Sequence, residues 1–333
     1  MLGLVSVLVL LVYKTKARKA QYLPTVKSPS VINSENNTPP IPVSVNYHFT
    51  RKCNFACGFC FHTAKTIFML PMDEAKRGLQ LLKDAGTLKV NFAGGEPFLH
   101  KEYLGELLDY CKTDLGFESV SIVSNGSMIT RPFLLKHGTN IDILAVSCDS
   151  FNPETNQKIG RLSGNPLPKL KKIAAWCKEF GIKFKINTVV NRYNVNEDMN
   201  HQITTLAPFR WKCFQVLLDE SENAGSTEQS RDVHPFLISR TEYDAFIARH
   251  QQQPSLVPEP NDLMRSSYLI LDEYMRFLSK EGEYKVSPSI LDVSVEAALD
   301  GMVWRREEFV ERGGIYEWSR EVVDGRKSEK LDW

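Results

Sequence analysis

The stretch Cys53-Asn-Phe-Ala-Cys57-Gly-Phe-Cys60 places three cysteines in a C-x3-C-x2-C spacing. It follows residues 43–49, whose alternating apolar pattern predicts a β-strand. Three thiolates in one short loop can hold a single soft metal centre. A cubane iron–sulfur cluster has four irons, so three cysteines would leave one iron open to a substrate or cofactor.

Two other interpretations of this loop stay open. Structural zinc needs four ligands, and His62 is close enough in sequence to supply the fourth. Cys57 and Cys60 could instead form a dithiol redox pair. The spacing, the aromatic Phe59 and the position at the end of a strand favour the cluster, because that end of parallel strands bears the chemistry in α/β folds.

Short apolar strands alternate with helical segments along the following chain. The expected helices are residues 72–85, 103–111 and 168–180, and the expected strands are residues 43–49, 89–92, 119–123, 141–146, 183–190 and 211–217. Strands separated by helices predict a parallel α/β architecture. No glycine-rich dinucleotide fingerprint follows the first strand, and a complete eight-unit barrel needs ~250 residues. We therefore predict a partial (β/α)6 barrel.

The chain is expected to contain four segments. Residues 1–20 form a hydrophobic and basic membrane anchor, and residues 21–42 form a linker rich in Ser, Pro and Asn. Residues 43–218 form the partial barrel. Residues 219–333 form a C-terminal extension, with a helix at 242–250, which we expect to close the active site when substrate binds.

Composition limits the classes of protein to which the chain can belong. Of its 333 residues, 42% are hydrophobic and 24% are charged, which excludes collagen-like, disordered and multi-span membrane classes. The formal net charge is +1, so a polyanion must be held by a local cluster of cations. Seven cysteines are an odd number, which indicates a reducing compartment. Four are scattered singly and are expected to be buried: Cys111, Cys148, Cys177 and Cys213.

Residues 2–12 (LGLVSVLVLLV) form an uncharged apolar run with the basic residues Lys14, Lys16, Arg18 and Lys19 after it. The run is shorter than the ~20 residues of a spanning helix. It lacks the charge before it and the cleavage site after it that are typical of a secretory signal. The basic cluster is expected to stay in the cytosol. We therefore predict a short insertion or an interfacial helix, with the rest of the chain on the cytosolic side.

The cysteine stretch resembles the signature of the radical S-adenosylmethionine (SAM) superfamily, C-x3-C-x-aromatic-C. The stretch AGGEP at 93–97 looks like the GGEP motif of these enzymes, which holds the SAM amine. The resemblance implies a [4Fe–4S] cluster on Cys53, Cys57 and Cys60, with SAM on the open iron. It also implies that an electron entering the sulfonium releases a 5′-deoxyadenosyl radical, so the cofactor supplies the difficult step.

Longer stretches are similar to the viperin family. They are NYHFTRKCNFACGFCFHTAKT, NFAGGEPFL, SIVSNGS, SCDSF, FKIN, RWKCFQ, SYLILDEYMRFL and the terminal LDW. The similarity covers roughly residues 43–333 and is weaker at 218–262 and near the C-terminus. It implies a lyase that converts a pyrimidine nucleoside triphosphate, CTP or UTP, to its 3′-deoxy-3′,4′-didehydro form after abstraction of the ribose 4′-hydrogen. Such a product lacks a 3′-hydroxyl and can terminate viral RNA synthesis.

The viperin resemblance also implies roles for individual residues. Those near SAM are Gly94, Gly95, Glu96, Ser124, Ser147 and Arg161, where hydroxyls and a guanidinium suit the ribose and carboxylate. Those near substrate are the triphosphate clamp Lys89, Lys185, Arg210 and Lys212, the amides Asn46 and Asn187, and the catalytic Tyr268. Without the resemblance, we would interpret Lys89 and Lys185 as surface charges and Tyr268 as a packed core residue. His48 and His62 receive no role.

The same resemblance implies several partners. They are a one-electron donor of the flavodoxin- or ferredoxin-type reductase kind, the cytosolic iron–sulfur assembly machinery through Trp333, and a membrane surface through the N-terminus. The membrane is expected to be the cytosolic face of the endoplasmic reticulum or a lipid droplet, although this N-terminus is shorter and more apolar than that of animal members. No direct binding of nucleic acid is expected.

Two alternatives belong to other functional classes. One is a radical SAM enzyme with a different substrate, such as a peptide or a molybdopterin precursor. Those enzymes commonly have a second cysteine cluster near the C-terminus, whereas no cysteine follows Cys213 here. The other is a metal-binding membrane scaffold without enzymatic activity.

Overall fold

The computed structural model describes residues 42–62, 65–161, 164–220, 222–225, 231–264, 267–280, 285–311 and 313–320. All of these residues belong to one compact unit. The predicted anchor at 1–20, nearly all of the predicted linker, and Trp333 lie outside the described residues. No helix within the described ranges is both long enough and apolar enough to cross a bilayer.

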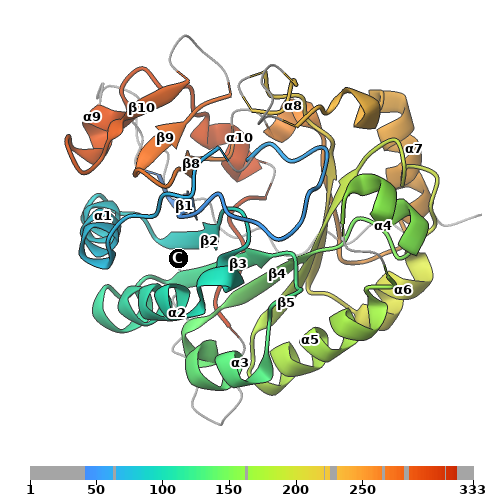
Figure 1. Ribbon diagram of the computed structural model, residues 1–333, viewed down its shortest axis with the longest axis horizontal. Coiled ribbons are helices and arrows are strands. Elements are labelled where there is room, and N and C mark those ends of the chain that lie inside the picture. Colours follow the sequence, from blue (N-terminus) through green and yellow to red (C-terminus); the bar gives the residue numbers. More distant parts are fainter. Residues whose placement is uncertain are drawn as a thin grey trace, which may run out of the picture. The chain divides into compact units, whose positions relative to one another are not determined.

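A single mixed sheet forms the centre of the fold (Figure 1). Its strands are β1 (Ser44–His48), β2 (Lys89–Ala93), β3 (Ser119–Ser124), β4 (Ile143–Ser147), β5 (Lys183–Val190), β6 (Arg210–Gln215), β7 (Leu256–Glu259), β8 (Ile270–Leu271), β9 (Arg276–Leu278) and β10 (Val286–Ser289). The order across the sheet is β10-β9-β8-β1-β2-β3-β4-β5-β6-β7. Strands β8 and β1 to β7 pair in parallel, and β9 and β10 are antiparallel. The predicted partial α/β barrel is confirmed, with its six expected strands as β1 to β6.

Helices follow most of the parallel strands and cover the outside of the sheet (Figure 1). They are α1 (Met72–Asp84), α2 (Lys101–Asp109), α3 (Arg131–His137), α4 (Pro153–Ile159), α5 (Leu167–Glu179), α6 (Asn200–Leu206), α7 (Arg240–His250), α8 (Asn261–Met264), α9 (Val295–Leu299) and α10 (Arg306–Glu311). The expected helix at 103–111 begins earlier, and a π-helical turn at 110–114 follows it.

The two faces of each strand have different roles. On β1, Val45 and Tyr47 are fully buried in the hydrophobic core, and the Tyr47 ring lies 6.2 Å from that of Phe92. The alternating residues Asn46 and His48 line the inside of the sheet instead. Because successive side chains of a strand point to opposite faces, each of the strands β1 to β6 supplies one row to the core and one row to the interior.

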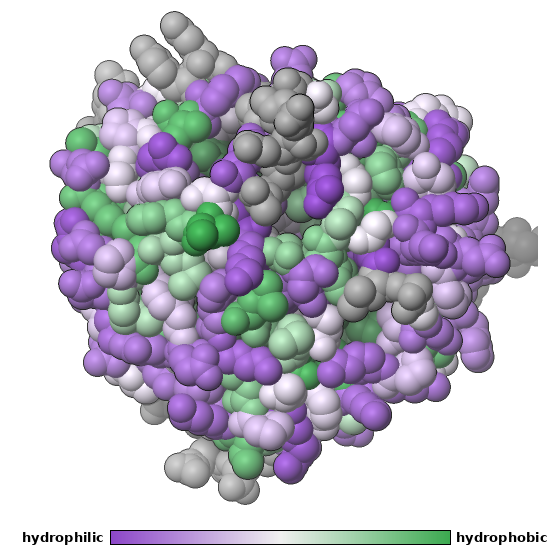
Figure 2. Space-filling model, viewed as in Figure 1, coloured by the Kyte–Doolittle hydropathy of each residue, from purple (hydrophilic) through white to green (hydrophobic). Residues whose placement is uncertain are grey.

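The chain beyond Leu218 contributes strands to both edges of the barrel sheet. Strand β7 pairs with β6 at one edge, whereas β8 pairs with β1 at the other edge. The opening of the partial barrel therefore lies between β7 on one side and β8 to β10 on the other. Polar residues predominate on the face in Figure 2, with apolar residues in small groups among them.

Candidate active site

The interior of the barrel sheet contains a cavity of about 350 Å³. The structure brings most of the predicted site residues together on its wall: Cys53, Cys57, Cys60, Gly94, Gly95, Ser124, Ser147, Arg161, Asn46, Lys89, Lys185, Asn187, Lys212 and Tyr268. Glu96 and Arg210 lie outside this lining. We call the cavity the lumen, and the end with the cysteine loop its upper end, because that loop follows the carboxyl end of β1.

The GGEP stretch after β2 holds one side of the cysteine loop by backbone contacts. The Gly95 amide donates to the carbonyl of Thr50 at 2.8 Å, and the Glu96 amide donates to that of Lys52 at 2.8 Å. A Cβ on Gly94 would lie 2.3 Å from the Thr50 oxygen, and one on Gly95 would lie 2.0 Å from the Lys52 oxygen. Both glycines are therefore required by the close approach of the two backbones.

The end of helix α4 holds the other side of the cysteine loop. The Ala56 amide donates to the Gly160 carbonyl at 3.0 Å, and the Gly58 amide donates to that of Ile159 at 2.9 Å. Gly160 ends the helix in the left-handed region, at φ 90°, and a Cβ there would lie 2.3 Å from the Ala56 oxygen. The loop is thus fixed between two turns that come from different parts of the chain.

The three thiols are close enough to influence one another electrostatically. Burial raises the pKa of Cys53 and Cys57, and it raises that of Cys60 to about 12. Nearby Arg161 opposes this rise at Cys53 and Cys57. Neutral thiols must lose their protons to become metal ligands, so loading a metal centre at this loop would release protons.

Across the described residues, no three Cys, His, Asp or Glu side chains gather as the ligands of a single ion would. A cubane cluster does not require that grouping, because each cysteine ligates a different iron and the sulfurs stand apart. The three-cysteine loop, held at the lumen edge by two turns, would fit such a cluster. Gly94, Ser147 and Arg161 beside it offer backbone, hydroxyl and guanidinium groups to an amino-acid cofactor.

Glu96 lies one layer behind the lumen wall and is fully buried. Its carboxylate accepts hydrogen bonds from Ser124 Oγ at 2.7 Å, from the Asn125 amide at 2.7 Å and from the Phe98 amide at 3.1 Å. Burial raises its pKa, and these donors oppose the rise. In this structure Glu96 fixes the turn that presents Ser124.

Arg161 is held in place by Asp149. Its Nε donates to Asp149 Oδ2 at 2.5 Å, and the other carboxylate oxygen of Asp149 accepts from the Val189 amide at 2.9 Å. The guanidinium also lies 5.9 Å from the ring centre of Phe55 in the cysteine loop. Asp149 therefore orients a cation beside the three thiols, a role that sequence reasoning did not assign.

The middle of the lumen presents amides. Asn91 donates to the Asn46 side-chain oxygen at 2.7 Å, and Asn46 Nδ2 donates to the Leu269 carbonyl at 3.2 Å. Within the described ranges, Asn187 Oδ1 is buried and makes no hydrogen bond. A buried acceptor without a partner is costly, so this amide is suited to bind a polar ligand.

Buried and half-buried cations from three strands gather at the lower end of the lumen. Lys89 is the first residue of β2, while Lys185 pairs in register with Arg210 at the start of β6, and Lys212 lies two residues further along. Burial lowers the pKa of Lys89 to about 7 and that of Lys185 well below its ordinary value, and the neighbouring cations lower both further. A concentration of unscreened positive charge of this kind favours a polyanion.

The segment 313–320 lies under this cluster and places two aromatic rings against it. The Arg210 guanidinium lies 4.0 Å from the ring centre of Tyr316, and the Lys89 ammonium lies 5.5 Å from Tyr316 and 5.2 Å from Trp318. These are cation–π contacts. Both rings also line the lumen, so we call this segment the floor.

The floor is anchored to the amino ends of the central strands. Lys183 Nζ donates to the Glu317 carbonyl at 2.9 Å, and the Arg320 amide donates to Asp142 Oδ1 at 3.0 Å. Arg320 Nη1 also donates to the Gly138 carbonyl at 2.8 Å. This part of the extension thus closes the lumen at the end opposite to the cysteine loop. Sequence reasoning did not single out this segment within the extension. The two aromatic residues Tyr316 and Trp318 are the feature that could have indicated it.

The hydroxyl of Tyr268 forms hydrogen bonds with two charged side chains, Lys212 and Glu259. Lys212 Nζ donates to this hydroxyl at 2.6 Å, and the hydroxyl donates to Glu259 Oε1 at 3.1 Å. Lys212 also forms an ion pair with Glu259. Sequence reasoning did not identify Glu259, because a lone glutamate at the end of a short strand has no distinguishing pattern.

His48 and His62 both lie at the lumen edge, with their ring centres 4.4 Å apart in an edge-to-face arrangement. Burial lowers the pKa of His48 to about 3 and that of His62 well below its ordinary value. Both rings are therefore neutral near neutral pH. Beside them, Arg51 Nε donates to Glu273 Oε1 at 2.7 Å.

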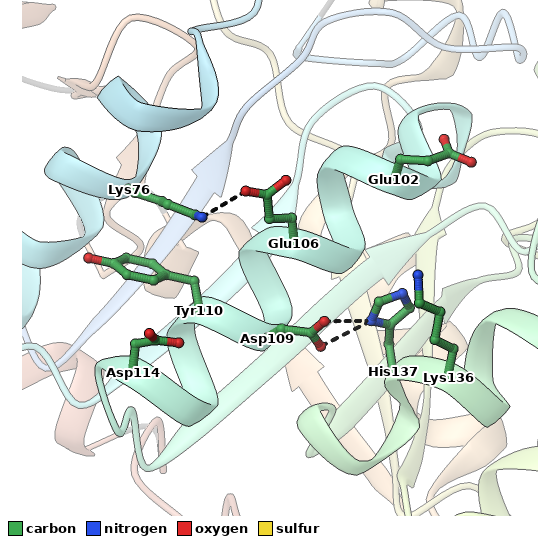
Figure 3. Close-up of a pocket in the computed structure, with 8 residues that line it drawn as sticks. All are labelled: Lys76, Glu102, Glu106, Asp109, Tyr110, Asp114, Lys136 and His137. Carbon is green, nitrogen blue, oxygen red and sulfur yellow. Dashed lines mark hydrogen bonds and ion pairs between the residues drawn. The ribbon is translucent and has the colours of Figure 1, made fainter.

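A second hollow, of about 440 Å³, lies on the outside of the barrel between α1, α2 and α3 (Figure 3). Four of its polar groups form two pairs: Lys76 pairs with Glu106 at 2.7 Å, and His137 Nδ1 lies 3.0 Å from Asp109 Oδ1. These contacts join neighbouring helices. Ion pairs between exposed helices are typical of a protein surface. The lumen is therefore the better candidate for an active site.

Comparisons with known proteins agree with this geometry. Residues 47–203 match the family model described as the radical SAM superfamily. The chain is 55% identical over 297 residues to the S-adenosylmethionine-dependent nucleotide dehydratase RSAD2 of Danio rerio, covering 88% of this chain and 81% of that protein. It is 34% identical over 296 residues to an S-adenosylmethionine-dependent nucleotide dehydratase of Flammeovirga pacifica, covering 86% of this chain and 98% of that protein.

A solved structure supports the fold alone. Native anSMEcpe with bound AdoMet and Cp18Cys peptide superposes with a TM-score of 0.60 at 14% identity, covering 83% of this chain and 84% of that chain. One assignment follows from three observations. They are the barrel, the cysteine loop at the carboxyl end of β1, and the similarity to the radical SAM family model and to the two dehydratases. The chain belongs to the viperin family of radical SAM enzymes, the S-adenosylmethionine-dependent nucleotide dehydratases, which use a [4Fe–4S] cluster and SAM.

Proposed function

We propose that the chain dehydrates a pyrimidine nucleoside triphosphate, CTP or UTP, to its 3′-deoxy-3′,4′-didehydro analogue. One observation supports this most: a single lumen has three cysteines at its upper end and a cluster of four cations at its lower end. The cations are Lys89, Lys185, Arg210 and Lys212. Amides and Tyr268 lie between the two ends.

The two ends are separated by strand geometry. Lys185, Asn187 and Val189 alternate along β5 and face the lumen. A strand rises ~3.3 Å per residue, so Lys185 lies roughly 13 Å below Val189, which neighbours the Asp149–Arg161 pair. A nucleotide with its phosphates on the cations would therefore direct its ribose toward the cysteine loop.

When bound at Cys53, Cys57 and Cys60, a cluster with SAM would supply a radical able to remove the ribose 4′-hydrogen. The 3′-hydroxyl then leaves with one proton as water, and one electron from an external donor completes the C3′=C4′ double bond. The cation cluster holds the phosphate chain, so the ribose is fixed along the lumen. The floor and the cysteine loop close opposite ends, which keeps bulk water from a reactive sugar.

The direct test uses anaerobically reconstituted protein with SAM, dithionite and each nucleoside triphosphate in turn. We expect CTP or UTP to accelerate formation of 5′-deoxyadenosine and to yield a product lighter by one water by mass spectrometry. ATP and GTP serve as matched controls for the triphosphate. Equal rates with and without pyrimidine nucleotide would reject the proposal.

We further propose that the enzyme works on the cytosolic face of the endoplasmic reticulum or a lipid droplet, and that its product stops viral RNA synthesis. The apolar run at 2–12 with its basic flank supports the membrane site, and the terminal Trp333 supports delivery of the cluster by the cytosolic assembly machinery. Electrons would come from a flavodoxin- or ferredoxin-type reductase. Fractionation of the full chain beside a chain lacking residues 1–20 tests the location, and loss of iron on deletion of Trp333 tests the delivery.

A further inference from the structure

Glu259 is a buried acid among the cations of the lower lumen. It ends strand β7, and it is 1% exposed. Its carboxylate pairs with Lys212 and accepts a hydrogen bond from the Tyr268 hydroxyl at 3.1 Å. A group that only served to attract phosphate would not be negative, so this carboxylate needs another explanation.

The backbone of Glu259 is fixed independently of the lumen. Its amide donates to the hydroxyl of Tyr243 at 2.8 Å, and that hydroxyl donates to the Cys213 carbonyl at 2.7 Å. Tyr243 belongs to α7 and is 1% exposed. A change confined to the carboxylate would therefore leave the strand in place.

The contact between Glu259 and Tyr268 crosses the opening of the partial barrel. Tyr268 precedes β8, which pairs with β1, whereas Glu259 lies in β7 at the other end of the sheet order. No backbone pairing joins β7 to β8 among the described strands. The hydroxyl of Tyr268 contacts both Lys212 and Glu259, and these two side chains also contact each other.

The charge of Glu259 also acts on the neighbouring cations. It opposes the lowering of the Lys185 pKa that burial, Lys212 and other cations produce. In the same way it would repel a phosphate chain that approached Lys185 and Lys212. Its presence should therefore weaken the binding of polyphosphate.

We propose that Glu259 is a positioning residue that aligns Lys212 and Tyr268 for the reaction while it lowers the affinity of the lumen for phosphate. This inference rests on the proposed function, because it takes a polyphosphate as the ligand of the lower lumen. It predicts two opposite effects of one substitution. Removal of the charge tightens binding and impairs the chemistry.

The experiment compares Glu259→Gln with Glu106→Gln in the reconstituted holoenzyme. Glu106 pairs with Lys76 on the outer surface, so its substitution removes one negative charge far from the lumen (Figure 3). Calorimetry with inorganic tripolyphosphate measures binding without the reaction. Turnover with the preferred nucleotide measures kcat and the ratio of 5′-deoxyadenosine to dehydrated product.

We expect Glu259→Gln to bind tripolyphosphate about fivefold more tightly, to lower kcat by about tenfold and to raise that ratio, because Tyr268 is no longer held. Glu106→Gln should match the wild type in every measurement. Tyr268→Phe should raise the ratio without tightening tripolyphosphate binding, which separates the two effects.

Weaker or unchanged binding of tripolyphosphate by Glu259→Gln would overturn the inference, as would an unchanged ratio. If Glu259→Gln misfolded, Tyr268→Phe and Glu259→Asp would test the inference instead. Glu259→Asp retains the negative charge, so it should bind tripolyphosphate with wild-type affinity. If the wild type neither bound tripolyphosphate nor converted a nucleotide, the proposed function itself would fail, and this inference with it.

Discussion

The two ends of the lumen are built in different ways. At the upper end, one short loop supplies all three cysteines, and it is held by backbone hydrogen bonds in which the Gly95 amide donates and the Gly160 carbonyl accepts. At the lower end, the cations come from several strands, and their closest neighbours include the aromatic rings of Tyr316 and Trp318. Backbone contacts tolerate no added atoms, whereas cation–π contacts allow side chains to move when a ligand enters. The comparison suggests a rigid end for cofactors and an adaptable end for substrate.

The largest effect should follow from adding one methyl group at the rigid end. In Gly95→Ala the new Cβ would lie 2.0 Å from the Lys52 carbonyl oxygen. Overpacking of this kind costs ~1–3 kcal/mol, and we expect about a 100-fold loss of 5′-deoxyadenosine formation together with reduced iron and sulfide per chain. Gly138→Ala is the matched control, since its nearest side-chain atom would lie 3.5 Å away. Wild-type iron content in Gly95→Ala would mean that the loop is not rigid.

A smaller effect should follow from removing one charge at the lower end. Lys185→Met keeps the length of the side chain, and we expect KM for the nucleotide to rise by about 30-fold, since a charge-assisted hydrogen bond contributes ~1.5–3 kcal/mol. Iron content and the rate of SAM cleavage without nucleotide should not change. The exposed substitution Lys136→Met should leave KM unaltered. Steady-state kinetics gives the KM of each variant. Loss of iron in Lys185→Met would contradict the view that the lower end serves the substrate and not the cluster.

A still smaller effect should follow from removing an aromatic ring of the floor. Tyr316→Leu loses the ring that lies 4.0 Å from the Arg210 guanidinium. Such contacts contribute ~0.5–1 kcal/mol, so we expect KM to rise by about threefold to fivefold with kcat nearly constant. Ile315→Ala, an exposed neighbour on the same segment, is the control. An equal rise of KM in both variants would show that the Tyr316 ring makes no specific contribution to binding.

The smallest effect concerns pH. Burial lowers the pKa of Lys89 to about 7, so the ammonium that attracts phosphate predominates below that pH and the neutral amine predominates above it. We expect the KM of the wild type to rise by roughly twofold relative to Lys89→Met between pH 6.5 and 8.5. The comparison with Lys89→Met cancels titration of the substrate. If the ratio of the two KM values stayed constant over this pH range, Lys89 would not be a cation that binds phosphate and titrates near pH 7.

Much of the fold followed from local pattern. The six strands from β1 to β6 were predicted because apolar alternation and turn residues mark each one. Strand β8, Ile270–Leu271, lies in a strand-like apolar stretch at 267–274, whereas β7 includes Pro258 and has no strong pattern of its own. Their places beside β1 and β6 in the sheet depend on partners more than 40 residues away in the chain.

The candidate site divides in a similar way. The spacing of Cys53, Cys57 and Cys60, together with Phe59 and the position after a strand, favoured an iron–sulfur cluster over zinc or a dithiol pair. The inward position of Lys89 and Lys185 was expected only through family resemblance, since lysines near strand ends are usually exposed. The structure then placed Glu96 behind the wall and added Asp149 and Glu259, whose importance depends on what they contact.

The sequence by itself determined the identity of the cofactor loop and the strand–helix order, because both arise from residues close together in the chain and from their periodicity. Only the tertiary structure decided which charges share the lower lumen. Parallel strands bring their amino ends to one edge, so Lys89 meets Arg210 across 121 positions of sequence, and Tyr316 meets both. Charges that repel one another in a folded interior are not marked by any local pattern, since the energy that gathers them comes from the packing of the whole sheet.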